Sequence, residues 1–164
     1  MLARVLARGL DATLAVVGDG DARTPLEAEI RRHGLSGRVT VTGWISYEQV
    51  PELLTEADIC LDPAPATPVN EKSTMIKVAE YLALGKPVVA FDLRETRRTA
   101  GDAALLIASG DIESFAEAII KLARDPGLRI ELAKRARKRA RQLVWAHSED
   151  ALVTAYGKVL GRSK

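Results

Sequence analysis

The stretch DICLDPAPATPVNEKSTMIKVAEYLALGKPVVAF, residues 58–91, is the most informative part of the sequence because its pattern predicts a complete strand, loop, helix and strand. Asp58–Leu61 and Val88–Phe91 are short apolar runs that predict buried strands. The proline-rich loop Asp62–Pro68 follows the first strand, and a helix is expected to begin at Ser73 or Thr74. This order is typical of a parallel βαβ unit.

Three more apolar, β-rich runs flank this unit, each separated from the next by about one helix. They are Leu14–Val17, Val39–Thr42 and Ala104–Ile107. Regular alternation of strands and helices favours a parallel sheet that is covered on both faces. The predicted fold class is therefore α/β, a Rossmann-like parallel sheet of about five strands flanked by helices.

Helix ends are marked by capping residues. Thr24, followed by proline and then Glu27, predicts a capping box. Ser46 begins a second box, with a regular helix expected from about Val50. Gly85 ends the helix of the opening stretch.

The pattern after Ile107 contains helices only. The expected helices are Ile112–Arg124, Pro126–Val144 and His147–Leu160. We interpret residues 1–164 as a single domain in which about 112–164 form a helical tail. The basic run Ala133–Gln142 belongs to the second of these helices, and we interpret it as a solvated face with peripheral contact to acidic lipids as the alternative.

Composition excludes several classes of protein. The 164 residues are 47% hydrophobic and carry 24 basic against 22 acidic side chains, a formal net charge of +2. This balance does not favour a nucleic-acid-binding surface. Cys60 is the only cysteine, which excludes an intrachain disulfide and a cysteine metal cluster and fits a cytoplasmic setting. No metal site is expected.

Two lysines near the expected helix start indicate an anion. Lys72 and Lys77 add positive charge where unpaired N–H groups already supply it, and Ser73 and Thr74 add hydroxyls. The pattern predicts a phosphate or diphosphate site at the carboxyl end of the sheet. The alternative is that a hydroxyl only caps the helix while the lysines are solvated.

Glu80 and two strand-end turns extend this candidate site. Glu80 could accept hydrogen bonds from a ribose diol, or it could form a surface pair with Lys77. Gly18 and Gly43 permit tight turns near a ligand, and Trp44 could stack on a base. A structural turn and a partly buried aromatic side chain are the alternatives.

Five segments, taken in order, resemble a known family. They are LAVVGDGD, GLSGRVTVTGWIS, VPELLTEADICLDPAP, STMIKVAEYLALGKPVVAFD and AGDAALLIASGDIESFAEAIIKLARDP. Together they are similar to the C-terminal, donor-binding domain of retaining GT-B glycosyltransferases, the "glycosyl transferases group 1" family.

The resemblance implies a transferase that uses a nucleotide sugar as its donor substrate and needs no cofactor. The segment Lys72–Met75, which includes Ser73 and Thr74, would hold the diphosphate and the sugar, and Glu80 would hold the ribose. The loop around Gly43 and Trp44 would contact the base. The catalytic residues cannot be assigned from this chain.

The chain also departs from the family pattern. Relatives carry a glutamate where Lys72 stands, although some show an NEKST-like loop. Their first strand and N-terminal domain have no counterpart here, so the isolated chain is expected to be inactive. The alternative function is a non-catalytic or truncated module that needs an N-terminal-domain polypeptide. The strands at Leu14–Val17 and Asp58–Leu61 must pair directly, leave a gap or accept another strand, and open edges favour self-association.

Overall fold

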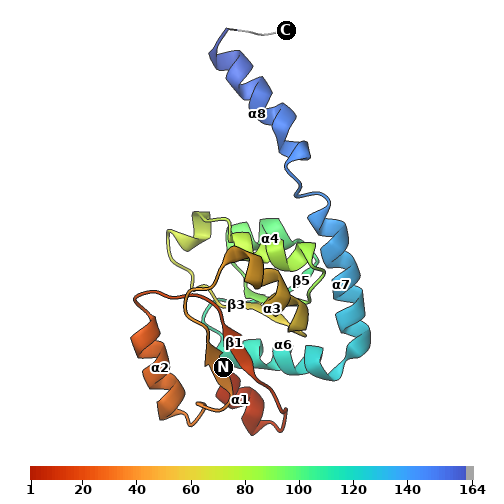
Figure 1. The fold of residues 1–164 in the computed structure, drawn as a ribbon. Helices are drawn as coiled ribbons and strands as arrows, with labels where there is room; N and C mark the ends of the chain where they lie inside the picture. The colour runs from red at the N-terminus through yellow and green to blue at the C-terminus, as the bar shows by residue number, and fades with distance from the viewer. Residues whose placement is uncertain (162–164) are drawn as a thin grey trace.

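The structure is a computed structural model that describes residues 1–161, and its strands alternate with helices as the sequence predicts (Figure 1). The strands are β1 Leu14–Val16, β2 Val39–Val41, β3 Cys60–Asp62, β4 Val88–Phe91 and β5 Ala104–Ile107. The α-helices are α1 Leu2–Ala7, α2 Arg23–Arg32, α3 Val50–Glu56, α4 Ile76–Ala83, α5 Arg94–Ala100, α6 Ile112–Arg124, α7 Pro126–Ala140 and α8 Ala146–Val159. Two short 3-10 helices, η1 Tyr47–Gln49 and η2 Asn70–Lys72, precede α3 and α4.

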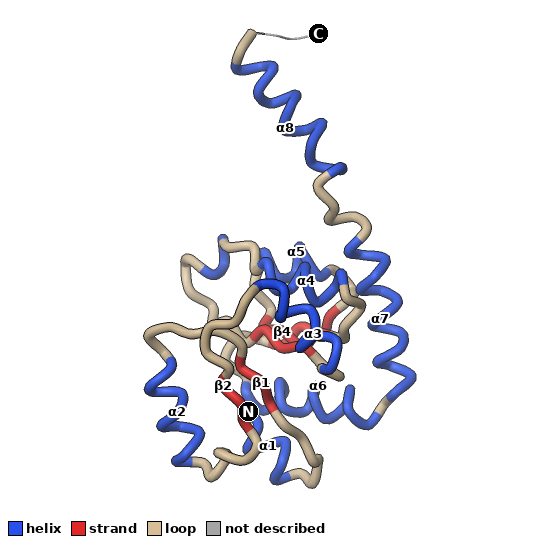
Figure 2. The backbone as a smooth tube through the Cα atoms, in the orientation of Figure 1, coloured by secondary structure: helices blue, strands red, loops and turns tan. Residues whose placement is uncertain are grey.

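The predicted parallel strands are present, but they are divided between two sheets. β3, β4 and β5 form one sheet in that order. β1 and β2 form the other, and they lie side by side in Figure 2. No ladder joins β1 to β3. The sequence allowed direct pairing of these two strands, a gap between them or an added strand, and the structure shows the gap. Each of these two strands therefore has one edge without a hydrogen-bonded neighbour among the described residues.

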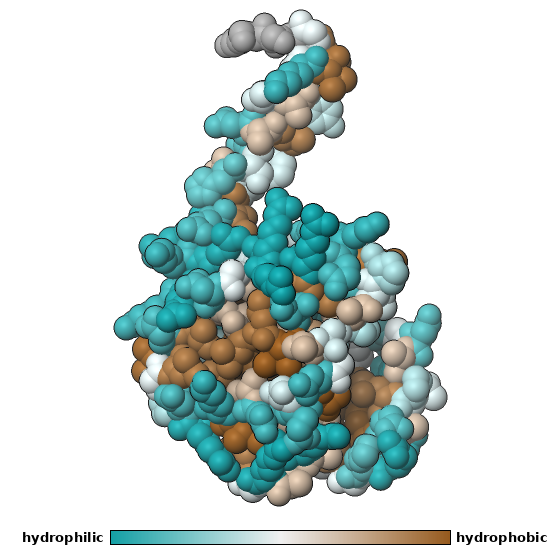
Figure 3. All heavy atoms as spheres, turned by 180° about the vertical axis from the view of Figure 1, so that it is seen from behind, coloured by the Kyte–Doolittle hydropathy of each residue, from teal (hydrophilic) through white to brown (hydrophobic). Residues whose placement is uncertain are grey.

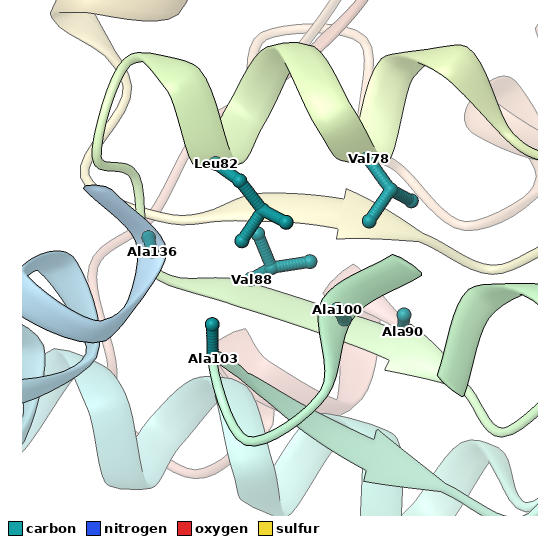
Figure 4. Close-up of a cluster of buried hydrophobic side chains, with 7 residues drawn as sticks. All are labelled: Val78, Leu82, Val88, Ala90, Ala100, Ala103 and Ala136. Carbon is teal, nitrogen blue, oxygen red and sulfur yellow. The ribbon is translucent and has the colours of Figure 1, made fainter. Parts of the chain in front are cut away.

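β4 lies at the centre of the core, and its side chains alternate between two layers. Val88 and Ala90 face α4 and α5, where they pack with Leu82 (Figure 4). Val89 and Phe91 face α6, where Phe91 meets Phe115 edge-on with ring centroids 5.0 Å apart. All four β4 residues are buried because both faces of this strand are covered.

Two predicted helix starts are wrong. α4 begins at Ile76 rather than at Ser73 or Thr74, because the hydroxyl of Ser73 donates to the carbonyl oxygen of Val69 at 2.8 Å and belongs to the η2 turn. α2 begins at Arg23, so Thr24 lies inside the helix and does not cap it.

The side chains near the start of α2 explain the second error. Glu27 accepts a hydrogen bond from Arg23 at 2.9 Å instead of reaching back to a capping residue. By contrast, the predicted capping box of Ser46 is present and α3 follows from Val50. Asp125 caps α7 by accepting from the amide of Leu128 at 2.9 Å.

The last helix, α8, leaves the body of the molecule. α7 ends at Ala140 rather than Val144, and α8 projects away with none of its residues buried (Figure 1). The space-filling view from behind shows polar and apolar side chains mixed along this arm and apolar surface gathered on the body (Figure 3). Within residues 1–161, no helix has the length and hydrophobicity needed to cross a membrane.

Part of the basic run on α7 has a structural role. Arg139 donates to the carbonyl oxygens of Thr99 and Arg98, at 2.9 and 2.6 Å, at the end of α5. Arg137 covers Gly85 so closely that a Cβ there would lie 2.6 Å from its Nε atom. These two arginines satisfy or cover helix ends where orphan carbonyl groups favour cations.

Truncation of Leu82 tests the α4 layer of the core. The Leu82 side chain is fully buried, and Leu82→Ala removes its contacts with β4. We expect the free energy of unfolding to fall by about 2–5 kcal/mol in urea denaturation. Ile130→Ala is the control, because Ile130 on α7 is 58% exposed and its truncation should cost less than about 0.5 kcal/mol. Equal effects of the two variants would contradict this packing.

Candidate functional site

The candidate site lies at the carboxyl ends of the parallel strands. The loop after β2 leads into η1, the loop after β3 leads into η2 and α4, and α5 begins shortly after β4. Ligands of open parallel sheets bind at this edge, because loops and helix N-termini meet there.

The start of α4 is uncapped. Met75 occupies the N-cap position without a side-chain hydrogen bond to the helix, so neither Ser73 nor Thr74 has the capping role that was the alternative to an anion site. The side chains of Lys72 and Thr74 are exposed, whereas Ser73 and Met75 are half-buried. The segment 72–75 therefore leads into a helix end whose first amides have no intrahelical acceptor.

Lys77, in the first turn of α4, is held by a buried carboxylate. Its Nζ atom lies 2.9 Å from Oδ1 of Asp62, the last residue of β3, which is only 1% exposed. Neither oxygen of Asp62 has a well-aligned hydrogen bond among the described residues. Sequence reasoning missed this partner, although an aspartate that ends a buried strand next to a lysine-bearing helix was a usable signal.

Glu80, one turn further along α4, binds a tyrosine rather than Lys77. The hydroxyl of Tyr47, the first residue of η1, donates to Oε1 of Glu80 at 3.0 Å, and this hydrogen bond raises the pKa of Tyr47. The predicted alternative, a Lys77–Glu80 surface pair, does not form. Tyr47 and Glu80 line a pocket of about 150 Å³ between α3 and α4. Its walls are formed by Tyr47, Val50, Pro51, Leu54, Glu80, Ala83 and Leu84.

The two glycine turns meet at the end of the smaller sheet. The amide of Gly18 donates to the carbonyl oxygen of Gly43 at 3.1 Å in an isolated bridge. Gly43 has φ +68°, a backbone conformation that L side chains rarely adopt, so this turn favours glycine, and a Cβ there would also displace the Nη1 atom of Arg23, 2.8 Å away. Trp44 is 82% exposed, which contradicts its alternative interpretation as a partly buried aromatic residue.

Other polar residues of this edge have structural partners. Glu71 accepts from the amide of Arg94 at 2.9 Å, at the start of α5. Arg97 donates to Asp92 at 2.8 Å and forms an ion pair with it. Residues 1–161 contain no group of three or more histidine, cysteine, aspartate or glutamate side chains that could hold a metal ion.

The predicted site residues thus form two groups. Lys72, Ser73, Thr74, Met75, Lys77 and Glu80 lie on the continuous segment formed by η2 and α4. Gly18, Gly43 and Trp44 lie at the end of the β1–β2 sheet. The hydrogen bond between Tyr47 and Glu80 connects the two groups, and the sequence contained no direct signal for it.

Solved structures resemble this fold. Sucrose-phosphate synthase from Thermosynechococcus elongatus superposes with a TM-score of 0.84 at 24% identity, over 99% of this chain and 42% of that chain. Alr3699/HepE of Anabaena, solved with UDP and glucose, gives a TM-score of 0.73 at 25% identity over 86% of this chain and 39% of that chain. Over the part that is covered, these GT-B structures share the fold of this chain.

Sequence comparison identifies relatives and a family. Alpha-D-kanosaminyltransferase of Streptomyces kanamyceticus is 29% identical over 82% of this chain and 34% of its own length. The 2-deoxystreptamine glucosyltransferase of the same organism is 29% identical over 99% of this chain and 42% of its own length. The chain thus spans less than half the length of these relatives. The family described as "Glycosyl transferases group 1" matches residues 1–125, and the chain belongs to this family.

Proposed function

We propose that this chain is the donor-binding part of a retaining glycosyltransferase, which binds a nucleoside diphosphate sugar and transfers the sugar to an acceptor. The observation that carries the proposal is the uncapped start of α4, with Lys77 in its first turn and Glu80 one turn behind it. This spacing suits a diphosphate followed by a ribose. The similarity to a structure solved with UDP and glucose supports the choice of ligand.

The first turn of α4 would bind the diphosphate. Its free amides and the exposed side chains of Lys72 and Thr74 supply hydrogen bonds and positive charge. Lys77 would contribute positive charge from a fixed position. If its ammonium group moved away from Asp62, a buried carboxylate would be left without a counter-charge. These groups stabilise the charge that develops on the diphosphate as it leaves the sugar.

Glu80 and the loop after β2 would bind the nucleoside. A carboxylate accepts hydrogen bonds from both hydroxyls of a ribose, as acidic residues do in dinucleotide-binding folds. The exposed ring of Trp44 and the backbone next to Gly43 offer a surface for the base. This arrangement would bring both sheets to the same ligand.

A second polypeptide segment would complete the enzyme. The chain spans less than half the length of the relatives named above, and β1 and β3 each have one edge without a partner strand among the described residues. We therefore propose a separate N-terminal GT-B domain as partner, and self-association through these edges as the second candidate. Lys134 and Lys138 on α7 and Arg141 at its C-cap form no ion pair within residues 1–161, in contrast to Arg135. We propose that these charges allow peripheral contact with acidic lipids in a cytoplasmic setting.

Calorimetric titration with UDP, GDP and ADP and their sugars tests the donor site. We expect at least one nucleotide to bind with a Kd of roughly millimolar, the strength expected of half a site. Glu80→Gln replaces a charged acceptor by a neutral one and should weaken binding about fivefold, equivalent to about 1 kcal/mol.

Glu131→Gln serves as the matched control, because Glu131 pairs with Arg135 on α7 and should leave the affinity unchanged. Circular dichroism confirms that each variant is folded. If no nucleotide binds the folded protein at millimolar concentration, the proposed donor site is wrong.

A double-mutant cycle on Lys77 and Asp62 tests whether the lysine must stay in place. Lys77→Met leaves the buried carboxylate uncompensated, and we expect the free energy of unfolding to fall by about 1–3 kcal/mol. Adding Asp62→Asn removes the uncompensated carboxylate and should restore most of the lost free energy of unfolding. Lys72→Met is the control, since Lys72 is exposed and should have little effect on stability. A Lys77→Met variant as stable as the parent would argue against the pair.

A further inference from the structure

We propose that Tyr47 competes with the ribose of the nucleotide for the carboxylate of Glu80 and thereby sets the affinity and the ribose selectivity of the donor site. This inference rests on the proposed function. It assigns a specificity-determining role to a residue of η1 that lies 33 positions from Glu80 in the sequence.

The contact occupies one of the two carboxylate oxygens that a ribose diol would use. The hydroxyl of Tyr47 donates to Oε1 of Glu80 at 3.0 Å. Lys77, the helical neighbour that would otherwise pair with Glu80, is held by Asp62 at 2.9 Å. No ion pair therefore engages Glu80 among the described residues, and the phenol is its side-chain donor. A ribose hydroxyl and a phenol hydroxyl are donors of the same kind, so each can replace the other on this carboxylate.

The phenol can leave without a change in the backbone. η1 is fixed by the capping box, in which Gln49 accepts from the amide of Ser46 at 3.1 Å. The Tyr47 side chain is 73% exposed, so apart from Glu80 little packing restrains its ring. Val50, Pro51 and Leu54 form an apolar wall of the same pocket, against which a displaced ring can rest. Displacement is then a rotamer change at one side chain.

The competition predicts the direction in which the nucleotide affinity changes when the phenol hydroxyl is removed. A ligand that must replace an internal hydrogen bond gains only the difference between the new contact and the lost one. Removing the phenol hydroxyl leaves Glu80 free, so a ribonucleotide should bind more tightly. A nucleotide without the ribose 2′ and 3′ hydroxyls never engages Glu80, so its affinity should not change.

Tyr47→Phe removes only the hydroxyl and is the test variant. In calorimetric titrations of the whole chain, we expect this variant to bind UDP, GDP or ADP about threefold more tightly than the parent, and to bind the matching 2′,3′-dideoxy diphosphate equally well. Tyr156→Phe is the matched control, because Tyr156 lies on the projecting helix α8 and is 62% exposed. In a Glu80→Gln background, Tyr47→Phe should give a much smaller gain.

Two results would overturn the competition. If Tyr47→Phe binds the ribonucleotide as the parent does or more weakly, the hydroxyl does not compete, although the donor site itself stands. If both the ribonucleotide and the dideoxynucleotide bind more tightly, Tyr47 obstructs the site sterically and does not compete with the ribose for the carboxylate of Glu80. A parent protein that binds no nucleotide at all would instead overturn the proposed function and this inference with it.

Discussion

The central strand β4 pairs in parallel with β3 on one side and β5 on the other, and this pairing organises both layers of the core. Because all four residues of β4 are buried, its alternate side chains must fill one layer with α4 and α5 and another with α6. Parallel pairing then directs the strand ends to one edge of the sheet, so that the helix start at Ile76 and the buried carboxylate of Asp62 arise there together. The position of the candidate site is a consequence of this core.

The smaller sheet depends on other contacts. β1 and β2 have no fully buried residue, and α2 beside them has none either. The N-terminal region is attached to the core through α1, where Val5 packs against α6 and Arg4 contacts Glu113 at 2.8 Å. At the strand ends, Tyr47 and Glu80 provide a second link between the two sheets. A nucleotide bound at both would therefore bridge parts of the molecule that share little core.

The polar residues of the site are engaged with one another before any ligand is considered. Lys77 contacts Asp62, Glu80 accepts from Tyr47, and Glu71 accepts from the first amide of α5. The Lys77–Asp62 pair lowers the net positive charge that a ligand meets. Where a ligand must replace one of these internal partners, its binding is an exchange of hydrogen bonds rather than a simple gain. The first amides of α4 and the exposed side chains of Lys72 and Thr74 are groups that a diphosphate could use without displacing a side-chain partner.

Local sequence patterns predict the strands, most of the helices and the edge at which the candidate site lies, because hydrophobic periodicity and helix-end residues act over a few neighbouring positions. β4, β5 and α6 have the bounds that these local patterns predict. The partners of Asp62, Glu71 and Glu80 were decided only by the tertiary structure, and so was the start of α4, where Ser73 turns back to Val69. The gap between β1 and β3 was likewise left open by local pattern. The physical reason is that these contacts join segments far apart in the chain, and a hydrogen bond or a strand pairing forms only when packing brings both of its partners to the same place.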